Sequence, residues 1–161
     1  MPILLLIRHG IAEDPAPGQR DAERALTLDG WAKTRSAMRG VVARGYLPTR
    51  GVTSPYRRAQ ETMHCLQEAA GHAFPVEAWE GLSPAGEPAE ADLWLRSLMA
   101  EAAWEEVVGL TSHQPFLGDL VFHLTGRSLE VKKASCTVIR WDSGLWRFEH
   151  HFVPSELRRG K

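Results

Sequence analysis

Five consecutive apolar residues, Ile3 to Ile7, begin near the start of the chain and lead directly into the polar group Arg8-His9-Gly10. A strand with one solvent-exposed face alternates apolar and polar residues, whereas a short continuous aliphatic run is typical of a strand buried on both faces. Such strands occur mainly in parallel sheets that helices cover on both sides. The run therefore predicts an α/β protein with this strand inside the sheet.

The rest of the chain alternates helical and extended patterns. Further strands are predicted at 51–53, 74–76 and 106–111, with a hairpin at 136–141 and 145–152; helices are predicted at 28–44, 57–70, 89–103 and 115–125. Residues 11–25 and 79–88 are expected to be loops, and 157–161 a frayed, solvated end. The length and this order predict one domain over residues 1–161, a three-layer α/β sandwich with a mixed, mostly parallel sheet.

Composition excludes several classes of function. The formal net charge of −1 provides no overall field that would attract nucleic acid or anionic lipid, so any attraction for anions must come from local arginines. No run is long enough to span a membrane, and the start does not resemble a secretory signal. Cys65 and Cys136 lie far apart, which argues against a zinc site or a redox pair. We expect a cytoplasmic, monomeric protein with no metal and no cofactor.

Polar motifs follow three of the predicted strands. Arg8-His9 comes after the first, the segment Ser54 to Arg58 after the second, and Ser112-His113 after the fourth. In an open α/β sheet, ligands bind beyond the carboxyl ends of the strands, so these motifs are expected to meet in one pocket. Two His and at least two Arg suit a phosphoryl group, because guanidinium forks grip its oxygens and a neutral imidazole can attack phosphorus.

In this order and spacing, the motifs resemble those of the histidine phosphatase superfamily. The resemblance rests on Arg8-His9-Gly10, on the segment Ser54 to Thr62, which reads S-P-Y-R-R-A-Q-E-T, and on Ser112-His113-Gln114-Pro115. It extends over about residues 3–124.

Within the superfamily, the chain is similar to the SixA-type phosphohistidine phosphatases. Residues 24–30 resemble their R-P-L-T-x-x-G segment, with Ala25 in place of the proline, and residues 80–86 resemble their E-L-x-P-x-G loop, with Gly81 as an extra residue. The stretch from Thr62 to Glu80 is too short for the helical lid that larger sugar-phosphate mutases insert there. The resemblance thus implies a domain with no helical lid insertion.

The resemblance also implies roles for individual residues. His9 would be the nucleophile, Arg8 and Arg58 would clamp the phosphoryl oxygens, and His113 would complete the cradle. Arg24 would be a further phosphate contact. The charges of the neighbouring arginines should depress the pKa of His9 and keep it neutral for attack.

A general acid is harder to assign. Glu80 occupies the place where the superfamily often has an acidic proton donor, but Glu13 or Asp14 could also reach the site. Phosphohistidine needs such an acid less than an ester does, because a protonated phosphoramidate expels a neutral imidazole, which leaves more easily than an alkoxide.

The function expected from this resemblance is a metal-independent phosphohistidine phosphatase with a phosphohistidine intermediate. Its partner would be a phosphorylated protein such as a histidine phosphotransfer domain. Two alternatives stay open: hydrolysis of a small phosphate ester in a pocket closed by the 11–25 loop, and a non-catalytic module that binds phosphorylated partners without turnover.

Overall fold

The computed structural model describes residues 1–159. Two of its elements, η1 and η2, are short 3-10 helices. In chain order the elements are β1 (Ile3–Arg8), η1 (Asp21–Glu23), α1 (Leu28–Ala43), β2 (Arg50–Thr53), α2 (Arg57–Ala70), β3 (Val76–Ala78), η2 (Glu80–Leu82), α3 (Pro88–Ala100), β4 (Val107–Ser112), α4 (Phe116–Thr125), β5 (Cys136–Asp142), β6 (Leu145–Phe152) and α5 (Pro154–Leu157).

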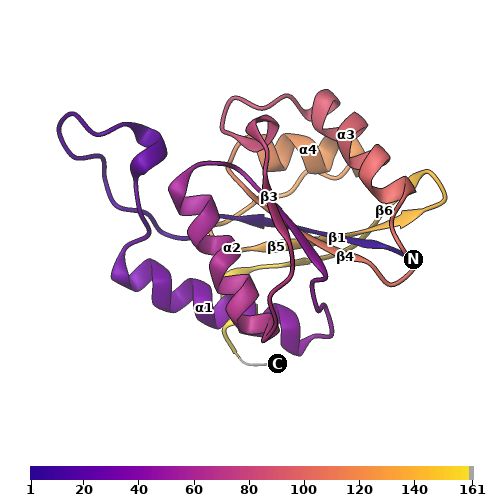
Figure 1. Ribbon diagram of the computed structural model, residues 1–161, viewed down its shortest axis with the longest axis horizontal. Coiled ribbons are helices and arrows are strands. Elements are labelled where there is room, and N and C mark those ends of the chain that lie inside the picture. Colours follow the sequence, from indigo (N-terminus) through magenta and orange to yellow (C-terminus); the bar gives the residue numbers. More distant parts are fainter. Residues whose placement is uncertain (160–161) are drawn as a thin grey trace.

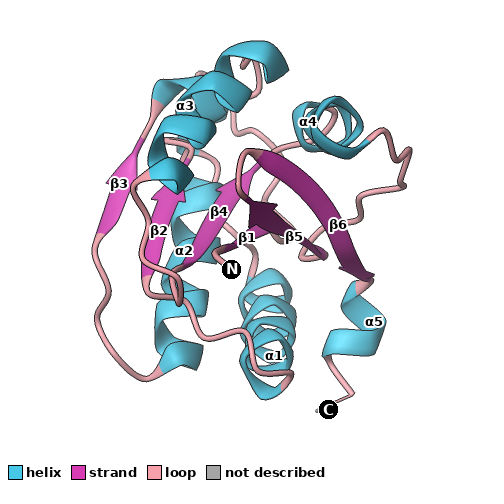
Figure 2. Cartoon of the chain, turned by 90° about the vertical axis from the view of Figure 1, so that its right-hand side faces the viewer, coloured by secondary structure: helices cyan, strands magenta, loops and turns pink. Residues whose placement is uncertain are grey.

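One six-stranded sheet forms the middle layer, with strand order β3-β2-β4-β1-β5-β6. The strands β3, β2, β4 and β1 run parallel to one another, and the hairpin of β5 and β6 adds two antiparallel strands beside β1. Helices α1, α2 and α5 cover one face, and α3 and α4 cover the other (Figures 1 and 2). The predicted three-layer sandwich with a mixed, mostly parallel sheet is confirmed.

The apolar run of β1 explains its place inside the sheet. Leu4 and Leu6 belong to the core beneath α3 and α4, whereas Leu5 and Ile7 belong to the core beneath α1 and α2. Successive side chains of a strand point to opposite faces, so a strand covered on both sides needs an apolar residue at every position. This strand holds Arg8 and His9 at the carboxyl edge of the sheet.

Two predicted elements differ from the structure by two residues or more at a boundary, and other boundaries differ by at most one residue. The third strand is Val76–Ala78 rather than 74–76. Phe74 is buried in the core, and Pro75 has no N–H to donate to a neighbouring strand. The Pro75 carbonyl only accepts a hydrogen bond, from the Gly51 N–H at 2.9 Å. The third helix ends at Ala100 instead of continuing to residue 103. Neither shift moves a residue of the expected site.

The prediction of a frayed end at 157–161 is wrong for Leu157. This residue is fully buried at the end of α5, which packs against α1. A Cβ added to Gly40 on α1 would lie 2.0 Å from the Leu157 carbonyl oxygen, so the missing side chain of Gly40 allows the close approach. Arg158 and Arg159 are exposed as expected, and the last two residues of the predicted tail lie outside the described part.

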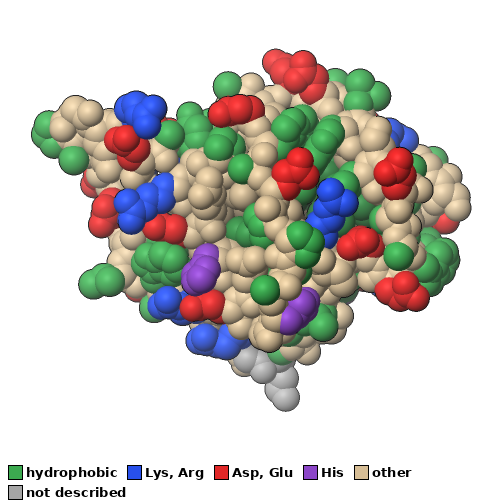
Figure 3. All heavy atoms as spheres, viewed as in Figure 1, with side chains coloured by type: hydrophobic (Ala, Val, Ile, Leu, Met, Phe, Trp, Pro, Cys, Tyr) green, Lys and Arg blue, Asp and Glu red, His purple; other side chains and the backbone are tan. Residues whose placement is uncertain are grey.

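The surface carries charges of both signs, in keeping with the small net charge (Figure 3). Among residues 1–159, no helix combines the length and apolar character that crossing a membrane requires. The segment before α1 projects from the body of the molecule at the left of Figure 1. We call residues 12–26 the flap, because an antiparallel bridge between Ala12 and Leu26 closes its base.

Candidate active site

The three polar motifs converge at one edge of the sheet. The strands β2, β4 and β1 are neighbours, and their parallel register brings their carboxyl ends together. The His9 N–H donates to the Ser112 carbonyl at 3.0 Å, and the Ser54 N–H donates to the Thr111 carbonyl at 3.0 Å. The rings of His9 and His113 lie with their centroids 5.2 Å apart. The predicted meeting of these motifs is therefore present in the structure.

The ring of His9 is held in one tautomer. Its Nδ1 lies 2.7 Å from the carbonyl oxygen of Gly10, which can only accept, so Nδ1 carries the ring hydrogen. The lone pair is then on Nε2, which accepts a hydrogen bond from Arg58 Nε at 3.3 Å. The side chain is 7% exposed. Nε2 is thus a neutral nucleophilic atom placed beside a fixed guanidinium group.

Both site histidines are held neutral. The pKa of His9 is lowered to about 4. Burial is the largest cause, and the charges of Arg58, Arg8 and Lys133 act in the same direction, while the hydrogen bond to Gly10 raises the pKa. Burial, followed by the charges of His9 and Arg58, lowers the pKa of His113 to about 3. The expected direction for His9 is confirmed, although desolvation contributes more than the arginines that suggested it.

Gly10, the residue after His9, packs against both α1 and α2. Its N–H donates to Thr62 Oγ1 at 3.1 Å, and that hydroxyl donates to the Arg58 carbonyl one turn earlier in α2. On the other side, a Cβ at Gly10 would lie 2.0 Å from Thr34 Oγ1 on α1. Only glycine fits this position, so the residue after the nucleophile is fixed by packing.

Arg58, in the first turn of α2, is 6% exposed and lies between His9 and Asp21. Its Nη1 donates to the Asp21 carbonyl at 2.9 Å, and its Nη2 lies 3.1 Å from Asp21 Oδ2. Hydrogen bonds from Arg24, and then from Arg58, lower the pKa of the Asp21 carboxyl. Sequence reasoning missed Asp21, although its spacing of three residues from Arg24 was a usable signal.

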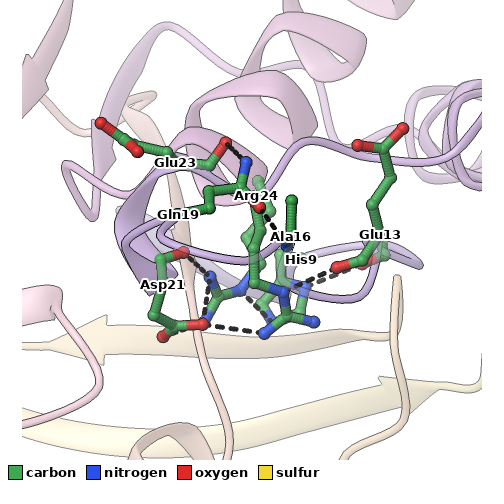
Figure 4. A network of polar contacts seen from close by, with 9 residues as sticks. His9, Glu13, Ala16, Gln19, Asp21, Glu23 and Arg24 are labelled. Carbon is green, nitrogen blue, oxygen red and sulfur yellow. Dashed lines mark hydrogen bonds and ion pairs between the residues drawn. The ribbon is translucent and has the colours of Figure 1, made fainter.

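Arg24 reaches the site through the flap. Its Nη1 lies 2.8 Å from Asp21 Oδ1, and its Nε donates to the Glu13 carbonyl at 2.7 Å. Figure 4 shows these side chains as one polar network next to His9. Arg24 therefore orients the carboxylate that holds Arg58, and its expected direct contact with phosphate stays a prediction.

His113 stands opposite His9 and is 1% exposed. Its Nε2 lies 2.8 Å from Ser54 Oγ, and that oxygen accepts a hydrogen bond from the Tyr56 N–H at 3.1 Å. Its Nδ1 is buried and has no hydrogen-bond partner within residues 1–159. When Nε2 accepts from the Ser54 hydroxyl, the ring hydrogen is on Nδ1, which can then donate to a bound oxyanion. Ser54 and Tyr56 lie in the segment Ser54 to Thr62, but no role was predicted for either side chain.

Arg8 lies on the other side of the nucleophile. Its Nη1 donates to the Val131 carbonyl at 2.9 Å, while its Nε is buried without a partner in the described part of the chain. Burial lowers the pKa of Arg8, and its charge in turn lowers the pKa of both His9 and His113. The expected cationic surroundings of His9 are thus present: Arg58 contacts its ring, and the charge of Arg8 lowers its pKa.

Glu80 is not brought into this cluster by any contact. It is exposed at the start of η2, and within residues 1–159 no hydrogen bond or ion pair joins its carboxylate to His9, Arg58 or His113. The side chains of Glu13 and Asp14 are exposed on the flap. The assignment of a general acid stays a prediction. No group of three or more His, Cys, Asp or Glu suited to a metal ion occurs in the described residues.

Two helices begin at the same edge. The 14-residue α2 starts at Arg57, and the 10-residue α4 starts at Phe116, three residues after His113. The free N–H groups and the positive dipole ends of such helices favour an anion. Together with the guanidinium groups, they make this edge electrostatically favourable for an anion such as a phosphoryl group.

Comparisons with known proteins agree with this geometry. The family model of the histidine phosphatase superfamily (branch 1) matches residues 4–85. The chain is 30% identical over 150 residues to the phosphohistidine phosphatase SixA homolog of Haemophilus influenzae, covering 86% of this chain and 88% of that protein. It is 34% identical over 152 residues to an uncharacterized protein of Picosynechococcus, covering 92% of this chain and 89% of the relative.

Among solved structures, the chain is similar to that of the protein histidine phosphatase SixA complexed with tungstate. The two are 25% identical with a TM-score of 0.87, and the match covers 96% of this chain and 99% of the other. The sheet, the helices on its two faces and the strand-end location of the candidate site therefore belong to a fold with solved examples.

Proposed function

We propose that this chain, which belongs to the histidine phosphatase superfamily, is a phosphatase that removes the phosphoryl group from phosphohistidine on a protein. The observation that carries the proposal is the state of His9: a neutral, tautomer-fixed imidazole whose Nε2 lies beside the Arg58 guanidinium at a strand end. A nucleophile in this state can form a covalent bond to phosphorus without first losing a proton.

The reaction would proceed in two displacements. The lone pair of His9 Nε2 forms a bond to phosphorus while the bond from phosphorus to the substrate imidazole breaks, and its electron pair stays on that imidazole. Water then attacks the phosphorus on His9, which frees the ring and yields inorganic phosphate. Arg58 and Arg8 would stabilise the charge on the phosphoryl oxygens in both steps, and no step requires a metal ion.

Three observations favour phosphohistidine on a protein over a small ester. No acidic side chain in residues 1–159 forms a hydrogen bond or ion pair with His9 or His113, and an imidazole leaving group needs a proton donor less than an alkoxide does. The connection from α2 to η2 contains only the short strand β3 and no helical insertion. Two of the relatives named above are called a phosphohistidine phosphatase SixA homolog and a protein histidine phosphatase SixA. The partner would be a phosphorylated protein, such as a histidine phosphotransfer domain.

We expect the protein to act as a monomer in the cytoplasm. Cys65 and Cys136 are free and buried, and burial raises the pKa of both thiols to about 12, so neither is suited to redox exchange. A structural role for reduced cysteines fits a reducing compartment.

A comparison of substrates tests the proposal. We expect turnover of phosphohistidine proteins to exceed that of small phosphate esters by about tenfold or more in kcat/KM, and to survive EDTA. Release of inorganic phosphate from each substrate, with and without the chelator, is the measurement. Preference for an ester would assign the site to small molecules, and tight phosphate binding without turnover would assign it to a binding module. Loss of activity on chelation, with recovery when a divalent ion is added, would refute the metal-free reaction.

The pH dependence follows from the lowered pKa of His9. The neutral ring is the nucleophile, and because its pKa is about 4, we expect kcat/KM to hold as pH falls to about 5 and to decrease below that. In the unfolded chain both histidines have their ordinary pKa of 6.5, so below that pH the unfolded state binds protons that the folded state does not. The free energy of unfolding therefore also decreases as pH falls below 6.5. Circular dichroism at each pH separates the two effects. A rate that falls with an apparent pKa above 6.5 in the folded enzyme would contradict this account.

A further inference from the structure

A hollow adjoins the candidate active site at Arg8, which is one of its lining residues. Its volume is about 440 Å³, which is in the range of small-ligand pockets. Five of its lining residues are cationic, and no Asp or Glu is among its described lining residues. The cations are Arg8, Lys33, Lys132, Lys133 and Arg158. We call this hollow the basic pocket.

Hydrogen bonds attach the segment bearing Lys132 and Lys133 to the nucleophile loop. The Ala134 N–H donates to the carbonyls of Arg8, at 2.9 Å, and His9, at 3.3 Å. The Ser135 N–H closes a turn on the Lys132 carbonyl at 3.0 Å. Ala134 adopts a φ of 61°, a left-handed conformation that is uncommon for a residue with a side chain and persists only where the surroundings hold it. The lysines are thus built into the edge of the active site.

Polar groups of the basic pocket lack partners in the described chain. Thr34 is fully buried and lines the pocket, yet its Oγ1 has no hydrogen-bond partner within residues 1–159, and the same holds for Arg8 Nε. No ion pair joins Lys132 or Lys133 to an acidic side chain in those residues, whereas Lys33 lies 3.1 Å from the exposed Asp29. On a chain with a net charge of −1, this is a local concentration of uncompensated positive charge.

We propose that the basic pocket binds an acidic side chain of the phosphorylated protein, next to the phosphoryl group that His9 attacks. The inference rests on the proposed function and extends it to substrate selection. Arg8 belongs to both sites, so an Asp or Glu near the phosphohistidine could enter the basic pocket while the phosphoryl group lies against Arg58. Two anchoring points would fix the orientation of the substrate imidazole for in-line displacement.

The test uses two synthetic phosphohistidine peptides that differ only in having Glu or Gln beside the phosphohistidine. We expect the wild type to prefer the Glu peptide by about tenfold in kcat/KM, equivalent to about 1.4 kcal/mol. The double variant Lys132→Gln/Lys133→Gln should bring the ratio close to one. Because the ratio compares two substrates of the same enzyme, any effect of Lys133 on the pKa of His9 cancels. High salt should also reduce the ratio.

A matched control is Arg35→Gln/Arg39→Gln, which removes two exposed charges of α1 that do not line the basic pocket and should keep the wild-type ratio. Efficient hydrolysis of both peptides with a ratio near one would overturn the inference and leave the proposed function standing. Hydrolysis of neither peptide would overturn both. An unchanged ratio in the lysine variant, with weakened turnover of a small bisphosphate, would assign the pocket to a free polyanion and overturn the inference.

Discussion

Replacing His9 with Ala should abolish the covalent phosphoenzyme and lower turnover by roughly 10⁴-fold or more, as removal of a catalytic nucleophile does. The wild type should form an acid-labile, base-stable phosphoryl adduct on Nε2, because Nδ1 carries the hydrogen that it donates to Gly10. Rapid quenching of the enzyme with a labelled phosphohistidine protein should trap this adduct before water removes it.

The exposed His72, which follows α2, provides the control. His72→Ala should form the adduct at the wild-type rate, because this ring lies outside the cluster around His9. Thermal melting of both variants would show whether they fold. Label that persists in a folded His9→Ala protein would refute the assignment of the nucleophile.

The parts of the fold that local patterns encode were predictable. The uninterrupted apolar run Ile3 to Ile7 indicated a strand covered on both faces. The helix predicted from residue 28 begins there, and the side chain of Thr27 caps it by accepting from the Gly30 N–H. Burial of Leu157 was not predictable, because it depends on the absence of a side chain at Gly40, more than a hundred residues earlier. Such complementary packing leaves no periodic signal in either segment.

The same distinction applies to the candidate site. The rule that parallel strands end at one edge was sufficient to bring His9, Ser54 and His113 together. The partner of Arg58 was not foreseen, because Asp21 lies in the short helix η1 of the flap, a segment that was expected to be a loop. Arg24 was expected to contact phosphate, which stays a prediction, and its pairing with Asp21 was not foreseen. Long-range pairing of charges thus decides how the arginines are arranged.

Arg58 and Glu80 should differ sharply in their effect on phosphohistidine hydrolysis. Arg58→Ala removes a buried charge beside the reacting nitrogen of His9 and should lower single-turnover rates by about 10²–10³-fold. Glu80→Gln should cost less than about tenfold, since an imidazole can leave already protonated and general acids otherwise contribute about 10²–10⁴-fold. The exposed position of Glu80, without a contact to His9 in the described chain, points the same way.

A variant of the neighbouring Arg57 is the control, because it removes the same charge from a position outside the site. It is exposed, and its Nε lies 2.8 Å from Glu61 Oε2, so Arg57→Ala should leave the single-turnover rate within about twofold of the wild type. Arg58→Lys, which keeps a charge but loses the fork that contacts both His9 and Asp21, should recover only part of the rate. A loss beyond about a hundredfold in Glu80→Gln on the same substrate would make Glu80 an essential proton donor and favour a phosphate ester, whose alkoxide needs that proton.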